Sequence, residues 1–210
     1  MRYELAIFDL DGTLADSFPF FMRVHNELAR KHGFSQVAPD QIEAMRALPT
    51  RQIMVRSGLR SWRLPLVARD FARRMRAADE VRLFEGVPEA LRGLSASALP
   101  LALVTSNSRE NVDRLLDVEL SRLFGHFECG ASLFGKRGRL KRAMRALRVA
   151  PARSIYVGDT SADGDAARAA GADFGAVEWG YGTSASLAAC RPSLQFATVK
   201  DLLQIAARRA

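Results

Sequence analysis

Short, mainly apolar runs mark four places in the chain where buried strands are expected. These runs cover residues 3–8, 101–104, 154–157 and 174–177. Apolar runs of this length are typical of strands in a parallel sheet, which is covered on both faces. Helical spacing of apolar residues lies between the later runs, over residues 110–118, 140–147 and 162–170. The alternation predicts an α/β fold, a three-layer Rossmann-like parallel sheet with helices on both faces.

The segment from residue 17 to residue 83 interrupts this alternation. Helical spacing extends over four stretches within it, at residues 18–31, 40–48, 51–57 and 64–78. None of these stretches has the pattern of a buried strand. A helical block that directly follows the first strand indicates an inserted domain. We therefore predict an α/β core at residues 1–16 and 84–210 and an all-helical cap insertion at residues 17–83.

Polar residues follow the ends of three of the apolar runs. In chain order they are Asp9 and Asp11, then Thr105, Ser106 and Asn107, and finally Asp159 and Asp163. Lys136 lies in the predicted loop before the helix at residues 140–147. Open α/β sheets place their sites at the carboxyl ends of the strands, so we expect these side chains to converge on one edge of the sheet.

This set of residues has the parts that phosphoryl transfer requires. Asp9 and Asp159 offer hard oxygen ligands, which suit a magnesium ion that also takes a substrate phosphate oxygen. Asp9 and Asp11 are two residues apart at a strand end, so one carboxylate can face the metal and the phosphorus while its neighbour faces the leaving group. The Thr105 hydroxyl and the Lys136 ammonium suit the phosphoryl oxygens. A nucleophile, a metal, charge stabilisation and a proton donor together predict a phosphoryl-transfer enzyme.

Four elements of the sequence, in this order, resemble the signature motifs of the haloacid dehalogenase superfamily. They are the run Asp9-Leu10-Asp11-Gly12-Thr13-Leu14, then Thr105, then Lys136, and then Gly158-Asp159 with Asp163. The helical insertion resembles the cap of the phosphoglycolate-phosphatase-like branch. The resemblance implies a Mg²⁺-dependent phosphatase that hydrolyses a small phosphorylated metabolite and closes its helical cap over it.

The resemblance also implies a role for each acid. Asp9 attacks phosphorus and becomes an aspartyl phosphate, while Asp11 protonates the leaving oxygen and later deprotonates the attacking water. This double duty needs an Asp11 carboxyl that is protonated at the start. The Asp9 carboxylate, the Asp11 backbone carbonyl and Asp159 hold the Mg²⁺. Asp163 is either a weaker metal ligand or a group that fixes Lys136 or a metal-bound water.

The phosphoryl group itself is expected to bind at the second and third motifs. Thr105, Ser106 and Asn107, with nearby backbone amides, would contact its oxygens together with Lys136. In much of the branch a proline follows the motif lysine, whereas Arg137 follows it here. This departure leaves the phosphatase chemistry intact and leaves the identity of the substrate open.

Three residues of the cap are candidates for contact with the leaving group. Arg46, Thr50 and Arg51 lie where related caps approach the active site, and an arginine there suits bidentate contact with an anion. The alternative is that they are exposed residues of an arginine-rich protein.

The positive charge of the chain has a simpler explanation than a nucleic-acid partner. The 210 residues include 31 Lys and Arg against 23 Asp and Glu, a net charge of +8, and only four of the basic residues are lysines. Over residues 137–148 the apolar residues recur at helical spacing, which predicts that the arginines there occupy the solvated face. We therefore expect no nucleic-acid partner.

The remaining features favour a cytoplasmic protein with no membrane partner. No apolar run approaches the roughly 18 residues that a membrane span needs. Acidic residues lie near the start, where a signal peptide would be apolar. Cys129 and Cys190 are interpreted as reduced thiols. We expect a monomer or a homodimer.

Three other functions stay open at this point. A phosphomutase of the same family would share the core residues and differ mainly in the cap. A dehalogenase would also use Asp9, but such enzymes resemble this core without the second acid, so Asp11 argues against one. A non-enzymatic phospho-receiver also combines carboxylates, a threonine and a lysine around magnesium, but its phosphorylated acid lies on a later strand.

Overall fold

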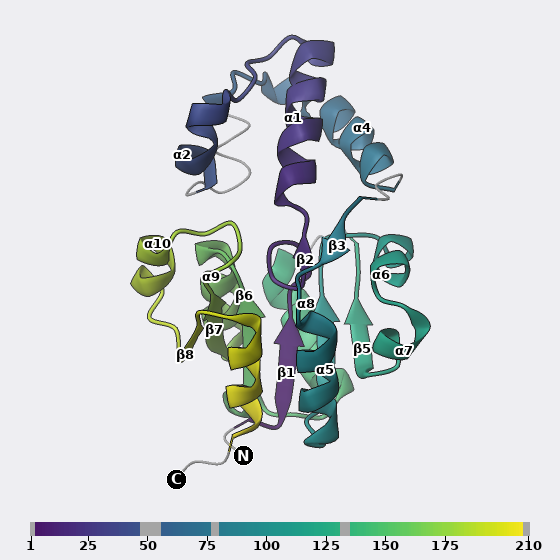
Figure 1. The fold of residues 1–210 in the computed structure, drawn as a ribbon, viewed down its shortest axis with the longest axis vertical. Coiled ribbons are helices and arrows are strands. Elements are labelled where there is room, and N and C mark those ends of the chain that lie inside the picture. Colours follow the sequence, from purple (N-terminus) through teal and green to yellow (C-terminus); the bar gives the residue numbers. More distant parts are fainter. Residues whose placement is uncertain (1–2, 47–55, 77–79, 131–134, 208–210) are drawn as a thin grey trace. The chain divides into compact units, whose positions relative to one another are not determined.

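The computed structural model of the chain describes residues 3–46, 56–76, 80–130 and 135–207 (Figure 1). The backbone divides into two compact units. One unit is formed by Met1–Asp16 together with Arg82–Ala210, and the other is formed by Ser17–Val81.

Six parallel strands form the sheet of the first unit, in the order β5-β4-β1-β6-β7-β8. Their bounds are β1 Leu5–Phe8, β4 Leu101–Val104, β5 Phe124–Glu128, β6 Ser154–Gly158, β7 Asp173–Val177 and β8 Leu194–Phe196. Every residue of β1, β4 and β6 is buried, as expected for strands that are mainly apolar and covered on both faces. The predicted α/β fold with a parallel sheet is confirmed.

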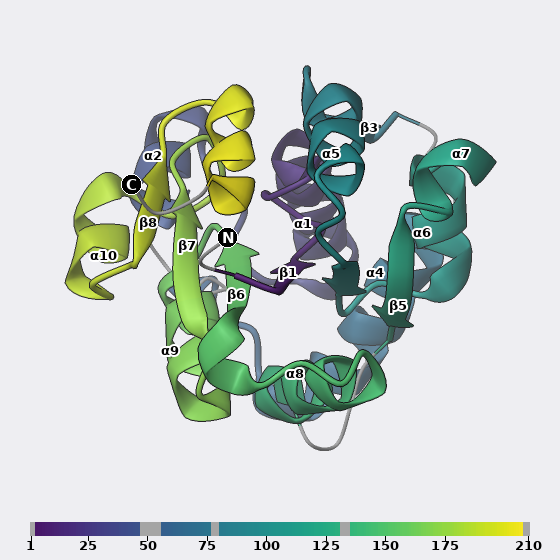
Figure 2. The same cartoon turned by 90° about the horizontal axis from the view of Figure 1, so that it is seen from below.

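Helices cover both faces of this sheet (Figure 2). Helices α8 (Gly135–Ala146) and α9 (Ser161–Ala170) lie on one face, and α5 (Val87–Ala96) and the 3₁₀ helix η4 (Val199–Ala206) lie on the other. The apolar core beneath α8 and α9 includes Leu5, Ile7, Leu140, Met144 and Tyr156. Burying these side chains contributes on the order of 25 cal/mol for each Å² of apolar surface removed from water.

Smaller elements complete the first unit. They are helices α6 (Arg109–Leu115), α7 (Val118–Ser121) and α10 (Ser184–Ala189), the 3₁₀ turn η3 (Pro151–Arg153), and an antiparallel pair of β2 (Ala15–Asp16) and β3 (Arg82–Leu83). The helix predicted over residues 110–118 is divided between α6 and α7. It breaks because the Asp117 side chain accepts a hydrogen bond from the backbone N–H of Leu120 at 2.8 Å and so caps a new helix.

The second unit contains helices and, over its described residues, no strand. Its elements are α1 (Phe18–His32), η1 (Pro39–Gln41), α2 (Ile42–Arg46), η2 (Ser61–Arg63) and α4 (Leu64–Arg76). The Phe21 ring of α1 meets the Phe71 ring of α4 edge-on, with centroids 5.6 Å apart. Most of the helix predicted over residues 51–57 lies outside the described residues. Over the described part of the chain, every helix is too short or too polar to cross a membrane.

Candidate active site

Three strands in the middle of the sheet end side by side, and a polar residue follows each of them. β1 is paired in register with β4 on one side and with β6 on the other. Asp9 follows β1, Thr105 follows β4 and Asp159 follows β6. The predicted convergence at the carboxyl edge therefore occurs for these three residues, because their strands are neighbours in a parallel sheet.

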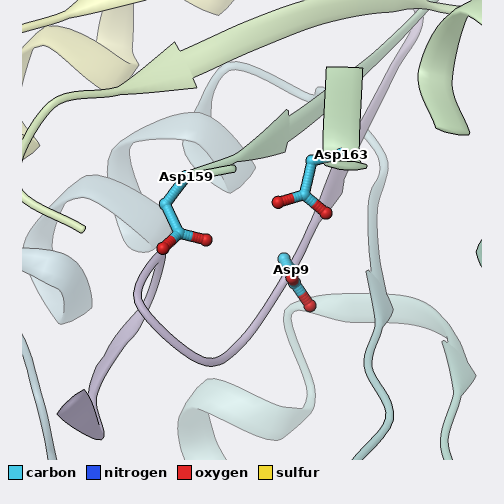
Figure 3. Close-up of side chains that lie close together, drawn as sticks. All are labelled: Asp9, Asp159 and Asp163. Atoms are coloured by element: carbon cyan, nitrogen blue, oxygen red, sulfur yellow. The ribbon is translucent and has the colours of Figure 1, made fainter. Parts of the chain in front are cut away.

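Asp9, Asp159 and Asp163 form a compact cluster of carboxylates (Figure 3). One carboxylate oxygen of each lies within 4.8 Å of the corresponding oxygen of the other two. All three residues are buried; Asp9, the most exposed of them, retains 7% of its accessible surface. Three acids held this close and this far from water repel one another strongly unless cations neutralise them.

Lys136 supplies one such cation. Its Nζ lies 2.7 Å from Oδ2 of Asp9 and 2.5 Å from Oδ1 of Asp163. The prediction that Lys136 lies in a loop is wrong, because α8 begins at Gly135 and Lys136 is in its first turn. The polar first turn, residues 135–138, carries no apolar residue that would have revealed this start in the sequence.

Asp163 is held by donors from three directions. Lys136 and the Tyr156 hydroxyl, at 3.2 Å, donate to Oδ1, while the backbone N–H and the hydroxyl of Thr160 donate to Oδ2 at 3.0 and 2.6 Å. The bonds from Thr160 form the N-terminal cap of α9. Burial favours a higher pKa, but Lys136 and Thr160 outweigh it and lower the pKa of Asp163. The structure therefore keeps this carboxylate ionised.

Burial acts in the opposite direction on the other two acids. Burial raises the pKa of Asp9 to about 6, against the opposing ammonium of Lys136. The pKa of Asp159 is raised well above its usual value by burial and then by the neighbouring Asp163 and Asp9 carboxylates. Lys136 brings one positive charge to a cluster of three carboxylates. Carboxylate oxygens with excess negative charge are the donor set that a divalent cation such as Mg²⁺ requires, so the residues present fit this metal.

The segment after β7 packs directly on Asp159. The backbone N–H of Tyr181 donates to Oδ2 of Asp159 at 2.8 Å, and the Thr13 hydroxyl lies 3.4 Å from Oδ1. The indole N–H of Trp179 donates to the backbone carbonyl of Thr13 at 3.0 Å. A Cβ at Gly180 would overlap the Asp159 side chain, so only glycine permits this approach. These contacts join segments far apart in the sequence, and no motif predicts them.

The three residues of the second motif make different contacts. The buried Thr105 hydroxyl accepts a hydrogen bond from the backbone N–H of Asn107 at 3.0 Å, which leaves its own hydrogen to donate. Ser106 is exposed. The Asn107 side chain donates from Nδ2 to Oδ2 of Asp11 at 2.6 Å. Asn107 was predicted as a phosphate ligand, and the structure places its amide on the second acid of the first motif.

A buried arginine joins α8 to the second motif. Arg139 retains 5% of its accessible surface and donates from Nη1 to the backbone carbonyls of Thr105 and of Gly130, the latter at 2.6 Å. The prediction that the arginines of residues 137–148 all face solvent is therefore wrong for Arg139. A sequence signal exists, because Arg139 lies three residues after Lys136 and four before the buried Ala143, on the same helix face.

The proposed substrate contacts of the cap are not placed by the structure. Thr50 and Arg51 lie outside the described residues, as does the side chain of Arg46, the last residue of α2.

A comparison with known protein families identifies the family that carries these motifs. The family model described as haloacid dehalogenase-like hydrolase matches residues 6–177. The chain belongs to this family. The resemblance inferred from the four motifs is thus confirmed, and the haloacid dehalogenase-like chain is an enzyme of the hydrolase class.

Curated relatives of this haloacid dehalogenase-like hydrolase include enzymes with two different names. The phosphoglycolate phosphatase of Synechococcus elongatus is 33% identical over 203 residues, which cover 96% of each chain. The tyrosine-protein kinase PtkA of Mycobacterium tuberculosis is 34% identical over 197 residues, covering 85% of this chain and 63% of the kinase.

A solved structure supports the fold of the hydrolase. The haloacid dehalogenase-like hydrolase SP0104 from Streptococcus pneumoniae superposes with a TM-score of 0.84 and 22% identity. The match covers 97% of this chain and 98% of the other chain. At this identity the likeness establishes the shared fold.

Proposed function

We propose that this protein is a cytoplasmic, Mg²⁺-dependent phosphatase that hydrolyses a small phosphorylated metabolite through an aspartyl phosphate on Asp9. One observation carries the proposal: the Asp9 carboxylate is buried in an acid cluster at the strand edge and is paired with Lys136 at 2.7 Å. The similarity to a phosphoglycolate phosphatase along nearly the whole chain supports a phosphoric monoester as the substrate.

In this proposal Asp9 is the nucleophile. One of its carboxylate oxygens forms a bond to phosphorus as the bond from phosphorus to the leaving oxygen breaks. The N–H of Leu10 donates to Oδ1 of Asp9 at 2.9 Å, and Lys136 donates to Oδ2, so the orientation of the carboxylate is fixed before the substrate binds. Lys136 and the Thr105 hydroxyl would then stabilise the charge on the transferring phosphoryl oxygens.

Asp11 is the proposed general acid and base. In the first step its carboxyl gives a proton to the leaving oxygen, which departs as an alcohol. In the second step the Asp11 carboxylate takes a proton from the water that attacks phosphorus. The bond between phosphorus and Asp9 then breaks, which releases inorganic phosphate and restores both acids.

Asp9, Asp159 and the backbone carbonyl of Asp11 are the proposed Mg²⁺ ligands. When bound, Mg²⁺ would neutralise charge on the phosphoryl oxygens and orient them. Both oxygens of Asp163 already accept hydrogen bonds from Lys136, Tyr156 and Thr160, which supports a role in positioning Lys136. We assign Asp163 to that role rather than to direct coordination.

Residues 17–83 are proposed to act as a cap domain that selects the leaving group. Arg46, Thr50 and Arg51 remain the candidate contacts within it. A phosphomutase would use the same core and would pass the phosphoryl group to a second hydroxyl instead of to water. One relative is named a tyrosine-protein kinase, so a protein hydroxyl is a further acceptor of the phosphoryl group to test.

The experiment is an assay of phosphate release from p-nitrophenyl phosphate and from a panel of metabolite phosphoesters, with and without Mg²⁺. Asp9→Asn is expected to lower kcat/KM by about a thousandfold or more. The matched control is Asp165→Asn, because Asp165 is an exposed acid on α9 and leaves the cluster intact. Unchanged turnover in Asp9→Asn would refute the nucleophile assignment, and phosphoryl transfer to an added hydroxyl acceptor without phosphate release would indicate a transferase.

A further inference from the structure

A chain of three side-chain hydrogen bonds leads from helix α6 to Asp11. Arg114 Nη2 donates to Oδ1 of Asn111 at 3.2 Å, and Asn111 Nδ2 donates to Oδ1 of Asn107 at 2.9 Å. Asn107 Nδ2 then donates to Oδ2 of Asp11 at 2.6 Å. Asn107 and Asn111 are buried, with 8% and 4% of their surface accessible. Asn111 and Arg114 are three residues apart on one side of α6, and Asn107 directly precedes Ser108, the N-cap of that helix.

The direction of this chain is set by its first member. A guanidinium group has only donors, so Asn111 must turn its carbonyl oxygen towards Arg114. Its amide nitrogen then faces Asn107, which accepts the hydrogen bond with its own carbonyl oxygen. The nitrogen of Asn107 is consequently the atom that faces Asp11. If the amide of Asn107 were reversed, its Nδ2 would face the Nδ2 of Asn111, and two buried donors would meet with no acceptor between them.

We propose that Asn107 is a positioning residue for proton transfer by Asp11, and that Asn111 and Arg114 set the orientation of its amide. This inference rests on the proposed function, in which Asp11 is the general acid. The N–H of Asn107 fixes the rotation of the Asp11 carboxyl group about its Cβ–Cγ bond. Because Oδ2 receives this N–H, the arrangement assigns the transferred proton to Oδ1.

The consequence depends on the leaving group. A phenolate that carries a nitro group departs without a proton, whereas an unsubstituted phenolate departs much faster when an acid protonates it in the transition state. Loss of the orientation of the Asp11 carboxyl group should therefore slow hydrolysis of the unsubstituted phenyl ester far more than hydrolysis of the nitrophenyl ester. A mutation that merely disturbs packing slows both esters equally.

The experiment compares phenyl phosphate with p-nitrophenyl phosphate, which have the same size and differ in the acidity of the leaving phenol. The variants are Asn107→Leu, Asn111→Leu and, as a reference, Asp11→Asn. For both leucine variants, the loss of kcat/KM on phenyl phosphate is expected to exceed the loss on p-nitrophenyl phosphate by about tenfold. The control is Asp113→Asn on the exposed face of α6. This substitution is expected to have the same effect on kcat/KM for both esters.

Each outcome decides the matter. Suppose that Asp11→Asn loses more kcat/KM on phenyl phosphate than on p-nitrophenyl phosphate. If the leucine variants then lose kcat/KM equally on both esters, or lose none on either, the positioning role is wrong while the proposed function stands. If Asp11→Asn does not discriminate, or the wild type hydrolyses neither ester, the general-acid assignment fails and the positioning role fails with it. A thermal unfolding midpoint for each variant identifies a loss that comes from unfolding, which also counts against positioning.

Discussion

Gly12 lies so close to Asp159 that a Cβ at residue 12 would overlap the Oδ2 atom of that carboxylate. Gly12 also has φ +74°, in the left-handed region that L residues avoid. The turn that follows the two acids of the first motif thus depends on glycine for two independent reasons. Asp11 directly precedes Gly12, so the shape of this turn affects both the proposed metal ligands and the proposed acid.

Gly12→Ala is therefore expected to abolish most of the activity and to destabilise the core. The left-handed backbone alone costs about 1–2 kcal/mol of unfolding free energy, and the overlap with Asp159 adds to it. Gly58→Ala is the matched control, because Gly58 has φ +71° and no atom within 4 Å of the position of a Cβ. Urea unfolding and phosphate release measure both effects; a Gly12→Ala variant no less stable than Gly58→Ala would contradict the overlap.

Asp159 is expected to destabilise the protein when no metal is bound. Burial and the neighbouring acids raise its pKa well above the usual 3.8, so in the folded, metal-free protein stability falls as the pH rises from 3.8 towards the folded pKa. Asp159→Asn removes this penalty, and we expect the metal-free variant to unfold at a higher temperature than the metal-free wild type.

With Mg²⁺ bound, the wild type should unfold at a higher temperature than Asp159→Asn. A cation present at about one hundred times its dissociation constant stabilises the folded wild type by about 2.7 kcal/mol. The thermal midpoint of Asp159→Asn should not respond in this way. Thermal scans with EDTA and with a Mg²⁺ titration provide the measurement, and an equal Mg²⁺ shift in both proteins would place the metal elsewhere.

Arg139→Met should lower both stability and activity. Its two hydrogen bonds to backbone carbonyls from a charged donor contribute about 1.5–3 kcal/mol each at a buried site. Arg142→Met is the matched control on the same helix, because Arg142 pairs with Glu128 on a more exposed face, where solvent screens an ion pair and its contribution to stability is small. Equal losses of unfolding free energy in the two variants would show that Arg139 does not hold the Thr105 segment.

The helical unit has an acid-sensitive contact of its own. Lys31 and then His32 lower the pKa of Asp70 to about 2, through hydrogen bonds of 2.5 and 3.0 Å. Because the folded value lies below the unfolded value of 3.8, the stabilisation is complete above 3.8 and is lost as the pH falls through about 2. Asp70→Asn should be less stable than the wild type at neutral pH, and the difference should shrink in acid. Urea unfolding across this range measures it; a constant difference would rule out the charge of Asp70 as the cause.

The sequence predicts the centre of the fold well and its edges poorly. β1, β4, β6 and β7 are covered on both faces, so they are mainly apolar runs that can be recognised without a structure. The edge strands β5 and β8 were not predicted. Within β5, Gly125 and His126 interrupt the apolar run, and β8 has only three residues. Edge strands contact fewer neighbours, so their sequences are less constrained.

The same contrast holds for the site. Asp9, Asp11 and Asp159 could be predicted because each follows an apolar run and matches a motif. Arg139 and Asn111 were not predicted. Helical spacing places Arg139 on the face of Lys136, but its bond to the Thr105 carbonyl, and the bond of Asn111 to Asn107, are evident only in the structure. Asn107 was predicted as a phosphate ligand from its position after an apolar run, and its hydrogen bond to Asp11 is evident only in the structure.

The most direct test of the central claim is to look for the phosphoryl group on Asp9. The Asp11→Asn variant, which lacks the proposed base for hydrolysis, is mixed with p-nitrophenyl phosphate and Mg²⁺, quenched in acid and analysed by peptide mass spectrometry. We expect one added phosphoryl group on the peptide that contains Asp9, and none when Asp9→Asn is introduced as well. A phosphoryl group on another residue, or turnover by the double variant at the wild-type rate, would contradict the account.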